Sequence, residues 1–295
     1  MREPTFIAAV GMTGGGKTVE NMKQIRAVTL GNSLKSVLPR KTLILDNNME
    51  YHNGNKDVQQ ILHPHGIGIK TIHWKQVPDF TRQRHIEVAR VIPMNDNGQL
   101  LAGKKFGETL NFVLENFMGG LIVGEDFKAM TGNSLNEELI SLLVTRRHKG
   151  CDTLVSLQSL RMIQPALMAV LKWIRLHKIT GFIKTSDEKF DSYIEMINIA
   201  KKIVDNRYKL GGENEWFFLK IQLQKSFIAG LYTKEEFNVA AQEYIFENWS
   251  QTVGKRLQHR DILTGKKKYT DKTALQSVLS EYINQYSQYS PRRQK

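Results

Sequence analysis

An eight-residue run near the amino terminus, GMTGGGKT at residues 11–18, constrains the fold of this chain more than any other stretch. It fits the spacing G-x-x-x-x-G-K-[ST], which is typical of a loop that wraps phosphate groups. The apolar run 6–10 stands directly before it, and a helix is expected after it, over residues 17–28. The sequence therefore predicts a phosphate-binding loop between a buried strand and a helix.

The residue types in this run suit a nucleotide that carries magnesium. Glycine has no Cβ and tolerates positive φ, so backbone N–H groups can turn toward phosphate oxygens. The Lys17 ammonium can reach the β- and γ-phosphates, and the Thr18 hydroxyl can ligate Mg²⁺. A glycine-rich turn without a ligand is the alternative, but it gives Lys17 and Thr18 no role. We expect ATP and Mg²⁺ as cofactors, and the residues expected to bind the nucleotide are Gly11, Thr13, Gly14, Gly15, Gly16, Lys17 and Thr18.

The length and charge of the chain narrow the possibilities further. Its 295 residues can bury one large core, or one core with a small appendage. We expect a P-loop core over residues 1–250 and a basic carboxyl-terminal extension over residues 251–295. The formal charge is +13, from 42 Lys and Arg against 29 Asp and Glu, which favours polyanionic partners such as nucleic acid.

Cysteine content and hydropathy indicate the compartment. A single cysteine, Cys151, excludes an intrachain disulfide and is typical of a reducing environment. No run approaches the roughly 18 to 20 apolar residues that a membrane-spanning helix needs. The start of the chain does not resemble a signal peptide. We therefore expect a soluble, intracellular protein without a transmembrane segment.

Two acids, Glu125 and Asp126, follow the apolar stretch 119–124 and are expected at the end of a buried strand. In a hydrolytic nucleotide site one carboxylate holds magnesium, usually through water, and another polarises the attacking water. Two registers remain open because Gly124 stands where one acid could be. Either Glu125 lies near the metal and Asp126 is the second acid, or Glu125 is the base and the metal-side acid is missing. Two solvated acids at the start of a loop are the non-functional alternative.

A second acidic turn follows the apolar stretch 41–46. Asp46 and Glu50 would lie at the carboxyl end of a strand, where α/β sheets place their ligands. The sequence supports two interpretations equally. These acids face the nucleotide or the attacking water, or an acid here simply caps a turn.

Cations cluster before the next expected strand, 153–157. Arg146 and Arg147 fall in the last turn of a helix predicted over 134–150. Cations at a helix carboxyl terminus contribute a few tenths to about 1 kcal/mol, which is the simplest explanation. The arginines also suit a finger that reaches the γ-phosphate of a neighbouring subunit. Gln158, at the tip of the strand, is well placed to sense the γ-phosphate or to orient water.

These residues carry a resemblance to a known family. Arg147-x-x-Gly150, an apolar strand, and Gln158 eight residues after the glycine resemble the FtsK/HerA superfamily of DNA-pumping ATPases. The run LILD at 43–46, with the acidic turn after it, is similar to the second strand of that superfamily. The resemblance covers residues 5–185 and implies that Arg147 or Arg146 is the finger and Gln158 the sensor. Gly124 departs from the usual acidic pair.

The resemblance also implies a fold and a function. The fold is α/β, of the RecA/ASCE-like P-loop NTPase class, with a mainly parallel sheet flanked by helices and a small α-rich basic carboxyl-terminal extension. Within the superfamily, the size of the chain and its lack of a membrane segment look most like the genome-packaging ATPases of tailless or membrane-containing viruses and phages. The implied activity is ATP hydrolysis that drives double-stranded DNA into a preformed capsid, with Lys17, Glu125 and Asp126 in the catalytic site.

The implied partners and location follow from this activity. We expect a homo-oligomeric ring, a hexamer by resemblance, with hydrolysis at the subunit interfaces. The ring would contact the DNA backbone without reading sequence, together with a capsid or portal vertex protein. The expected location is the cytoplasm of the host cell or the packaging vertex of the virion.

Three other functions share the phosphate-binding loop. One is an assembly or export ATPase like those of filamentous phages, which acts on single-stranded DNA and typically carries a membrane anchor. Another is a small-molecule kinase, which has no need for the arginine and glutamine of residues 147–158. The third is a nucleotide-binding assembly protein that does not hydrolyse, for which Gly124 is the only hint.

The composition shifts from residue 255 onward. Residues 255–295 hold ten Lys or Arg against three acids, with tyrosines at 269, 282, 286 and 289 among them. Cations with aromatic neighbours can bind phosphates and stack on bases. A solvated, flexible tail is the alternative.

Overall fold

The computed structural model describes residues 4–101, 103–125, 149–181, 188–211, 216–261 and 263–291, with the backbone alone at 103, 104, 166 and 188. The chain divides into two compact units, residues 1–173 and 174–295. The expected domain boundary at residue 250 does not coincide with this division and stays a prediction.

The first unit alternates strands and helices along the chain. Its elements are β1 (Phe6–Val10), α1 (Lys17–Leu30), η1 (Ser33–Lys35), β2 (Thr42–Leu45), α2 (Lys56–Ile61), η2 (His63–His65), β3 (Ile69–Ile72), η3 (Trp74–Gln76), α3 (Val77–Arg82), β4 (Val88–Val91), α4 (Gly103–Asn116), β5 (Leu121–Gly124), β6 (Asp152–Leu157), η5 (Leu160–Met162) and α7 (Pro165–Met168).

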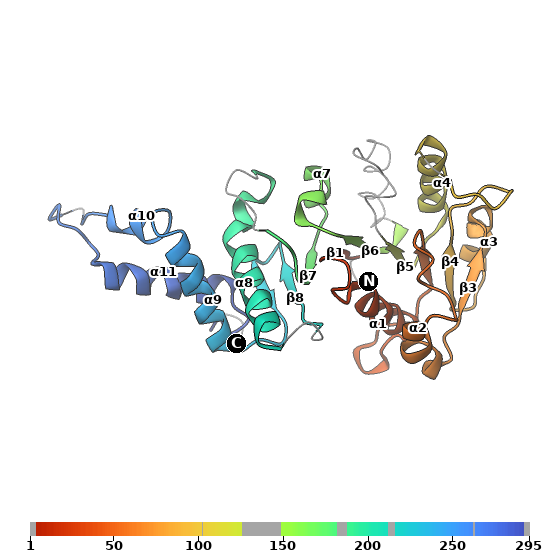
Figure 1. The fold of residues 1–295 in the computed structure, drawn as a ribbon, viewed down its shortest axis with the longest axis horizontal. Helices are drawn as coiled ribbons and strands as arrows, with labels where there is room; N and C mark the ends of the chain where they lie inside the picture. Colours follow the sequence, from red (N-terminus) through yellow and green to blue (C-terminus); the bar gives the residue numbers. More distant parts are fainter. Residues whose placement is uncertain are drawn as a thin grey trace. The chain divides into compact units, whose positions relative to one another are not determined.

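The strands of this unit follow the order β3-β4-β2-β5-β6-β1, and their pairings are all parallel. Figure 1 shows α1 and α2 on one side of these strands and α4 on the other. The expected mainly parallel sheet flanked by helices is confirmed. Because all six strands run the same way, their carboxyl ends meet at one edge, where parallel sheets place ligands.

Helix α1 packs its apolar face against the centre of this sheet. Met22 and Ile25 are fully buried in one cluster with Ile44 of β2 and Val123 of β5. The same cluster includes Tyr51, from the loop after β2. Burial of each such side chain contributes about 1.5–3 kcal/mol relative to exposure. The packing therefore anchors α1, and the loop before it, to the strands that carry the acids.

The second unit holds the remaining elements. They are β7 (Trp173–Leu176), which begins at the boundary, η6 (Glu188–Tyr193), α8 (Ile194–Gly211), β8 (Leu219–Gln222), β9 (Phe227–Ala229), α9 (Lys234–Glu247), α10 (Val253–Leu257) and α11 (Asp271–Tyr286). Strands β8 and β9 form an antiparallel hairpin. Thr233 and Glu236 form a capping box at the start of α9.

Several boundaries differ from those that the sequence predicts. A short helix is expected from Pro165 to Ile174, but α7 ends at Met168 and Trp173 begins β7. Residues 52–86 are expected to form loops around one or two short edge strands. The stretch 52–86 contains helices α2 and α3 as well as one short strand. Strand β9 was not foreseen, because its three residues carry too short a pattern to recognise.

Two of the carboxyl-terminal tyrosines also have a different role from the one expected. Tyr282 and Tyr286 are 4% and 5% exposed, and each donates a hydrogen bond of 2.9 Å to the Glu195 carboxylate. Burial and this carboxylate raise the pKa of both phenols. They belong to the core of the second unit and cannot stack on bases. Residues 271–286 form a packed helix, which contradicts the flexible-tail alternative for this stretch.

Gly120 stands directly before β5 and should not tolerate a side chain. A Cβ there would lie 2.4 Å from the Lys41 carbonyl oxygen and 2.6 Å from the Phe117 ring. We predict that Gly120→Ala lowers the free energy of unfolding by about 1–3 kcal/mol, through overpacking. Gly107→Ala is the matched control, because nothing lies within 4 Å of a Cβ there. In the interior of α4 this change should stabilise by about 0.5–1 kcal/mol. Urea unfolding of both variants tests the contrast, and equal effects would contradict it.

Candidate nucleotide site

The phosphate-binding loop connects β1 to α1, as the sequence predicts. Gly14 and Gly16 adopt left-handed φ values of 77° and 76°, a region that a β-carbon disfavours. The Gly11 N–H donates to the Leu157 carbonyl at 3.0 Å, which ties the loop to the end of β6. Thr13 and Gly14 are exposed at the tip, and Gly16 leads directly into α1. The loop is held at its base and open at its tip.

Lys17 folds back over this loop. Its Nζ donates to the carbonyl oxygens of Gly11 at 2.6 Å and Met12 at 2.9 Å. The ammonium therefore lies inside the turn that residues 11–16 describe. A phosphate held by the loop would take these positions as a stronger, charged acceptor. The site fits a phosphate group, with Lys17 as its cation.

Thr18 lies beside the carboxylate of Glu50, for which the sequence supports two roles. Its Oγ1 donates to Glu50 Oε2 at 2.9 Å. A hydroxyl and a carboxylate oxygen at this distance are the hard oxygen ligands that Mg²⁺ prefers. In the described part of the chain no group of three or more His, Cys, Asp or Glu side chains forms a metal cluster. A magnesium ion here would be held mainly through a bound nucleotide and water, as is usual for this ion.

Asp46 positions the turn that carries Glu50. Its carboxylate is fully buried and accepts the backbone N–H groups of Glu50 at 2.9 Å and Tyr51 at 3.0 Å. Arg90 of β4 balances the charge, with its Nη1 at 2.9 Å from Asp46 Oδ2. Asp46 therefore fits the interpretation that an acid caps the turn. Glu50 fits the other interpretation, because it faces the phosphate-binding loop.

Glu125 lies at the end of β5, within a buried polar cluster. It is 4% exposed, and its Oε1 accepts hydrogen bonds from Asn21 Nδ2 at 2.5 Å and from the Tyr51 hydroxyl. Asn21 also donates to Ser156 Oγ at 2.9 Å. Helix α1, the turn after β2 and strand β6 thus converge on one carboxylate. Asn21 and Tyr51 belong to this candidate site but are not expected from the sequence. For Asn21 a signal exists, because it lies three residues after Thr18 and therefore on the same face of α1.

Burial controls the protonation of this cluster. Desolvation raises the pKa of Glu125, while hydrogen bonds from Tyr51, Ser156 and Asn21 partly offset the rise. Burial also raises the pKa of the Tyr51 phenol, and the Glu125 charge adds to this effect. The phenol therefore stays protonated and remains a donor to the carboxylate.

The other expected site residues fall in two groups. Gln158 is exposed and directly follows β6, beside Gly11, because Leu157 pairs with Val10. The structure thus brings Gln158 to the loop, as expected from its position in the sequence. Asp126, Arg146 and Arg147 lie outside the described residues.

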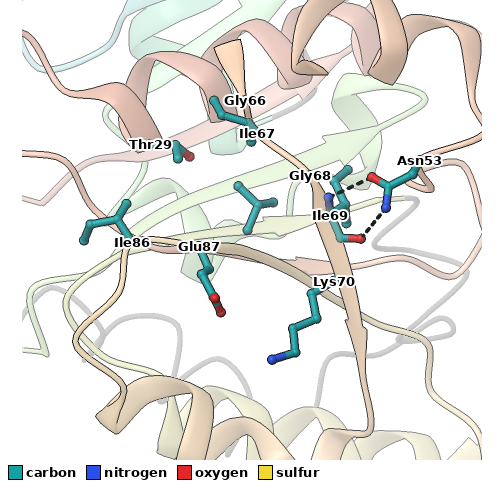
Figure 2. A pocket seen from close by; sticks show the side chains of 10 residues that line it. Thr29, Asn53, Gly66, Ile67, Gly68, Ile69, Lys70, Ile86 and Glu87 are labelled. Atoms are coloured by element: carbon teal, nitrogen blue, oxygen red, sulfur yellow. Dashed lines mark hydrogen bonds between the residues drawn. The ribbon is translucent and has the colours of Figure 1, made fainter. Parts of the chain in front are cut away.

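A separate pocket lies at the opposite end of this sheet. It has a volume of 460 Å³ and is lined by residues at the amino ends of β3 and β4, including Lys70 and Glu87. Figure 2 shows the Asn53 amide making two hydrogen bonds to the backbone of β3, of 2.9 and 3.0 Å. The pocket contains none of the expected site residues.

The loop and the strand order together define the P-loop NTPase fold. Strand β6 lies between β1, which precedes the phosphate-binding loop, and β5, which precedes Glu125. This strand order is that of the expected RecA/ASCE-like class. None of the described helices is long and apolar enough to cross a membrane.

Comparisons with known proteins give similarity at the level of structure only. No protein-family model and no curated protein matches the chain. The genome packaging NTPase B204 from Sulfolobus turreted icosahedral virus 2, in complex with ATP-gammaS, is 12% identical, with a TM-score of 0.47 over 78% of this chain and 97% of that chain. Its complex with AMP gives a TM-score of 0.44, with the same identity and coverage. The N-terminal domain of zonular occludens toxin from Neisseria meningitidis is 14% identical, with a TM-score of 0.34 over 59% of this chain and 76% of that chain. At these values the similarity says nothing about the chemistry of the site.

The Asp46–Arg90 pair should be important for stability. We predict that Arg90→Met lowers the free energy of unfolding by about 3 kcal/mol, because it leaves a fully buried carboxylate without its cation. Arg82→Met is the control, since Arg82 pairs with Asp79 on the surface, where both side chains are more than 70% exposed. That change should cost less than about 1 kcal/mol. Denaturant unfolding measures both, and a small loss in Arg90→Met would contradict the role of the pair.

The buried Glu125 should cost the protein stability at neutral pH. Because the folded-state pKa of Glu125 is raised above its ordinary value of 4.5, its favourable contribution is present at pH values below 4.5. That contribution is lost as the pH rises through the folded-state pKa. We predict that Glu125→Gln unfolds at a higher temperature than the wild type at pH 7, and that the difference narrows toward pH 4.5. Thermal unfolding across this range measures it; a gap that widens on acidification would contradict the raised pKa.

Proposed function

We propose that this protein is an ATPase that translocates double-stranded DNA and packages a viral genome. The observation that carries the hydrolytic part is the convergence of the phosphate-binding loop, the Thr18–Glu50 pair and the buried Glu125 at one edge of the sheet. A protein that only bound nucleotide would have no need to bury an acid there, since burial of a charge is costly.

Each residue then has a distinct task. Lys17 and the loop backbone bind the phosphates, and Thr18 and Glu50 lie where magnesium would be held. Magnesium, when bound, neutralises the charge on the phosphate oxygens. A water oxygen attacks the γ-phosphorus, the bond to the β–γ bridging oxygen breaks, and ADP and phosphate leave.

The burial of Glu125 supports one of the two registers. A base must reach water, but Glu125 is 4% exposed and its Oε1 is already bonded to Asn21 and Tyr51. We therefore infer that Glu125 takes the metal-side position, where its negative charge would favour the ion without taking a proton from water. Asp126 then accepts the proton of the attacking water.

The coupling to DNA is inferred from the sequence. Gln158, beside the loop, would sense the γ-phosphate, and Arg147 or Arg146 would complete the site of the neighbouring subunit. This requires a homo-oligomeric ring, for which a hexamer is the expectation from the FtsK/HerA resemblance. The net charge of +13 supports a polyanionic cargo held through its backbone. A capsid or portal vertex protein would be the docking partner, in the cytoplasm of the host cell or on the virion.

Steady-state ATP hydrolysis, with and without duplex DNA, tests this proposal. We predict turnover that duplex stimulates, and a loss of at least about 100-fold in Lys17→Ala, which removes the phosphate cation. Asp126→Asn should lower kcat by about 10²–10⁴-fold without changing nucleotide affinity. Glu125→Gln should also raise the magnesium concentration that gives half-maximal turnover. If Glu125→Gln lowers kcat alone and Asp126→Asn has little effect, Glu125 is the base and the register is reversed.

The remaining outcomes identify the alternatives. Stimulation by single-stranded DNA but not by duplex would favour an export ATPase of the filamentous-phage kind. Turnover that is indifferent to any DNA would favour a kinase. Nucleotide binding without turnover would favour an assembly protein that does not hydrolyse.

A further inference from the structure

A short hairpin in the second unit holds three consecutive exposed lysines, Lys266, Lys267 and Lys268. It comprises residues 259–261 and 263–270, between α10 and α11, and is called the basic hairpin below. Arg260 and Lys267 pair across it in antiparallel fashion. The Lys268 N–H donates to His259 O at 3.0 Å, and the Asp261 N–H donates to Lys266 O at 2.8 Å. The backbone is thus held in a defined shape.

The turn of the basic hairpin uses its one acid internally. The Asp261 carboxylate accepts the N–H groups of Leu263 at 3.1 Å and Thr264 at 2.8 Å, and the Thr264 hydroxyl at 2.9 Å. These bonds hold the pKa of Asp261 below its ordinary value. The acid therefore shapes the turn.

Four cations of the basic hairpin are exposed. They are Arg260, Lys266, Lys267 and Lys268. In the part of the chain that the structure describes, none of them forms a salt bridge; the Arg260 guanidinium donates to the carbonyl oxygen of Gly265 at 3.1 Å. By contrast, the nearby Arg256 is paired with Glu281. Like charges directly opposite each other destabilise a strand pair, so Arg260 and Lys267 work against the fold of the hairpin.

The cations occupy both faces of the hairpin. Side chains alternate along a strand, so Lys266 and Lys268 project from one face and Lys267 from the other, together with Arg260 across from it. A two-stranded ribbon fits the major groove of duplex DNA, where phosphates line both sides. A membrane surface would meet only one face.

We propose that the basic hairpin binds the phosphate backbone of duplex DNA, as a contact outside the unit that holds the nucleotide site. The proposal rests on the function proposed above, because it names where the DNA is gripped. The repulsion between its cations is relieved when phosphates bind, and counterions are released. Binding at this site is independent of sequence and weakens steeply with salt.

The test is duplex binding by the full-length protein, measured by fluorescence anisotropy at about 50 and 200 mM salt. The variant replaces Lys266, Lys267 and Lys268 by alanine. We expect its affinity at low salt to fall by at least about tenfold. The slope of log K against log salt should become shallower by up to about 2.7, or about 0.9 for each phosphate that the variant no longer neutralises. Its thermal unfolding temperature should match or exceed that of the wild type, because like-charge repulsion is removed.

A matched control removes the same charge elsewhere. Lys209, Lys225 and Lys234 are also exposed and belong to the same unit. Their triple alanine variant should keep most of the affinity and of the salt slope. Replacing the three hairpin lysines by arginine should keep both as well.

Other results would overturn the proposal. Equal losses in the two alanine variants would show a general effect of charge. Unchanged duplex affinity with reduced binding to vesicles of phosphatidylserine and phosphatidylcholine would make the basic hairpin a membrane contact. If the wild type binds duplex and the hairpin variant binds equally well, only this inference fails. If the wild type binds no duplex at any salt, the proposed translocase fails with it.

Discussion

The hydrogen bonds of the Asp46 carboxylate organise the candidate site. This buried acid caps the turn after β2 through two backbone N–H groups and is neutralised by Arg90 from β4. The turn then presents Glu50 to Thr18 and Tyr51 to Glu125. Two strands, a turn and a helix are thereby held in one arrangement. Replacing a buried ion pair as a whole changes stability little, whereas removing one partner is costly, so we infer that this pair mainly fixes geometry.

In the role proposed for Glu125, function and stability oppose each other at this edge of the sheet. A carboxylate removed from water raises the free energy of the folded state, and here the pKa of Glu125 rises through burial. Asn21 and Tyr51 reduce the cost without removing it. Perturbed acids of this kind gather where chemistry needs them, and the surrounding packed core of α1 and the sheet compensates.

The second unit uses similar residue types for a structural purpose. Tyr282 and Tyr286 of α11 converge on Glu195 of α8, so two phenols share one carboxylate within the core. In the sequence these tyrosines stand among cations and look like partners for bases. Their helical spacing places them on one face of α11, and that face is packed against other helices. Among the described residues from 255 onward, four of the exposed cations lie in the basic hairpin, and Lys268 there lies over the ring of Tyr269.

The sequence by itself determined the phosphate-binding loop, its flanking strand and helix, and the α/β class, because each depends on local spacing and apolar periodicity. It also placed Gln158 at the end of its strand. Only the tertiary structure decided which acid faces the phosphate-binding loop. Asp46 and Glu50 have similar local sequence patterns, but their partners differ: Asp46 pairs with Arg90 of β4, whereas Glu50 accepts a hydrogen bond from Thr18 of α1. The same holds for Asn21 and Tyr51, whose contacts with Glu125 span 104 and 74 residues. Such contacts depend on the order of parallel strands, which no short stretch of sequence encodes.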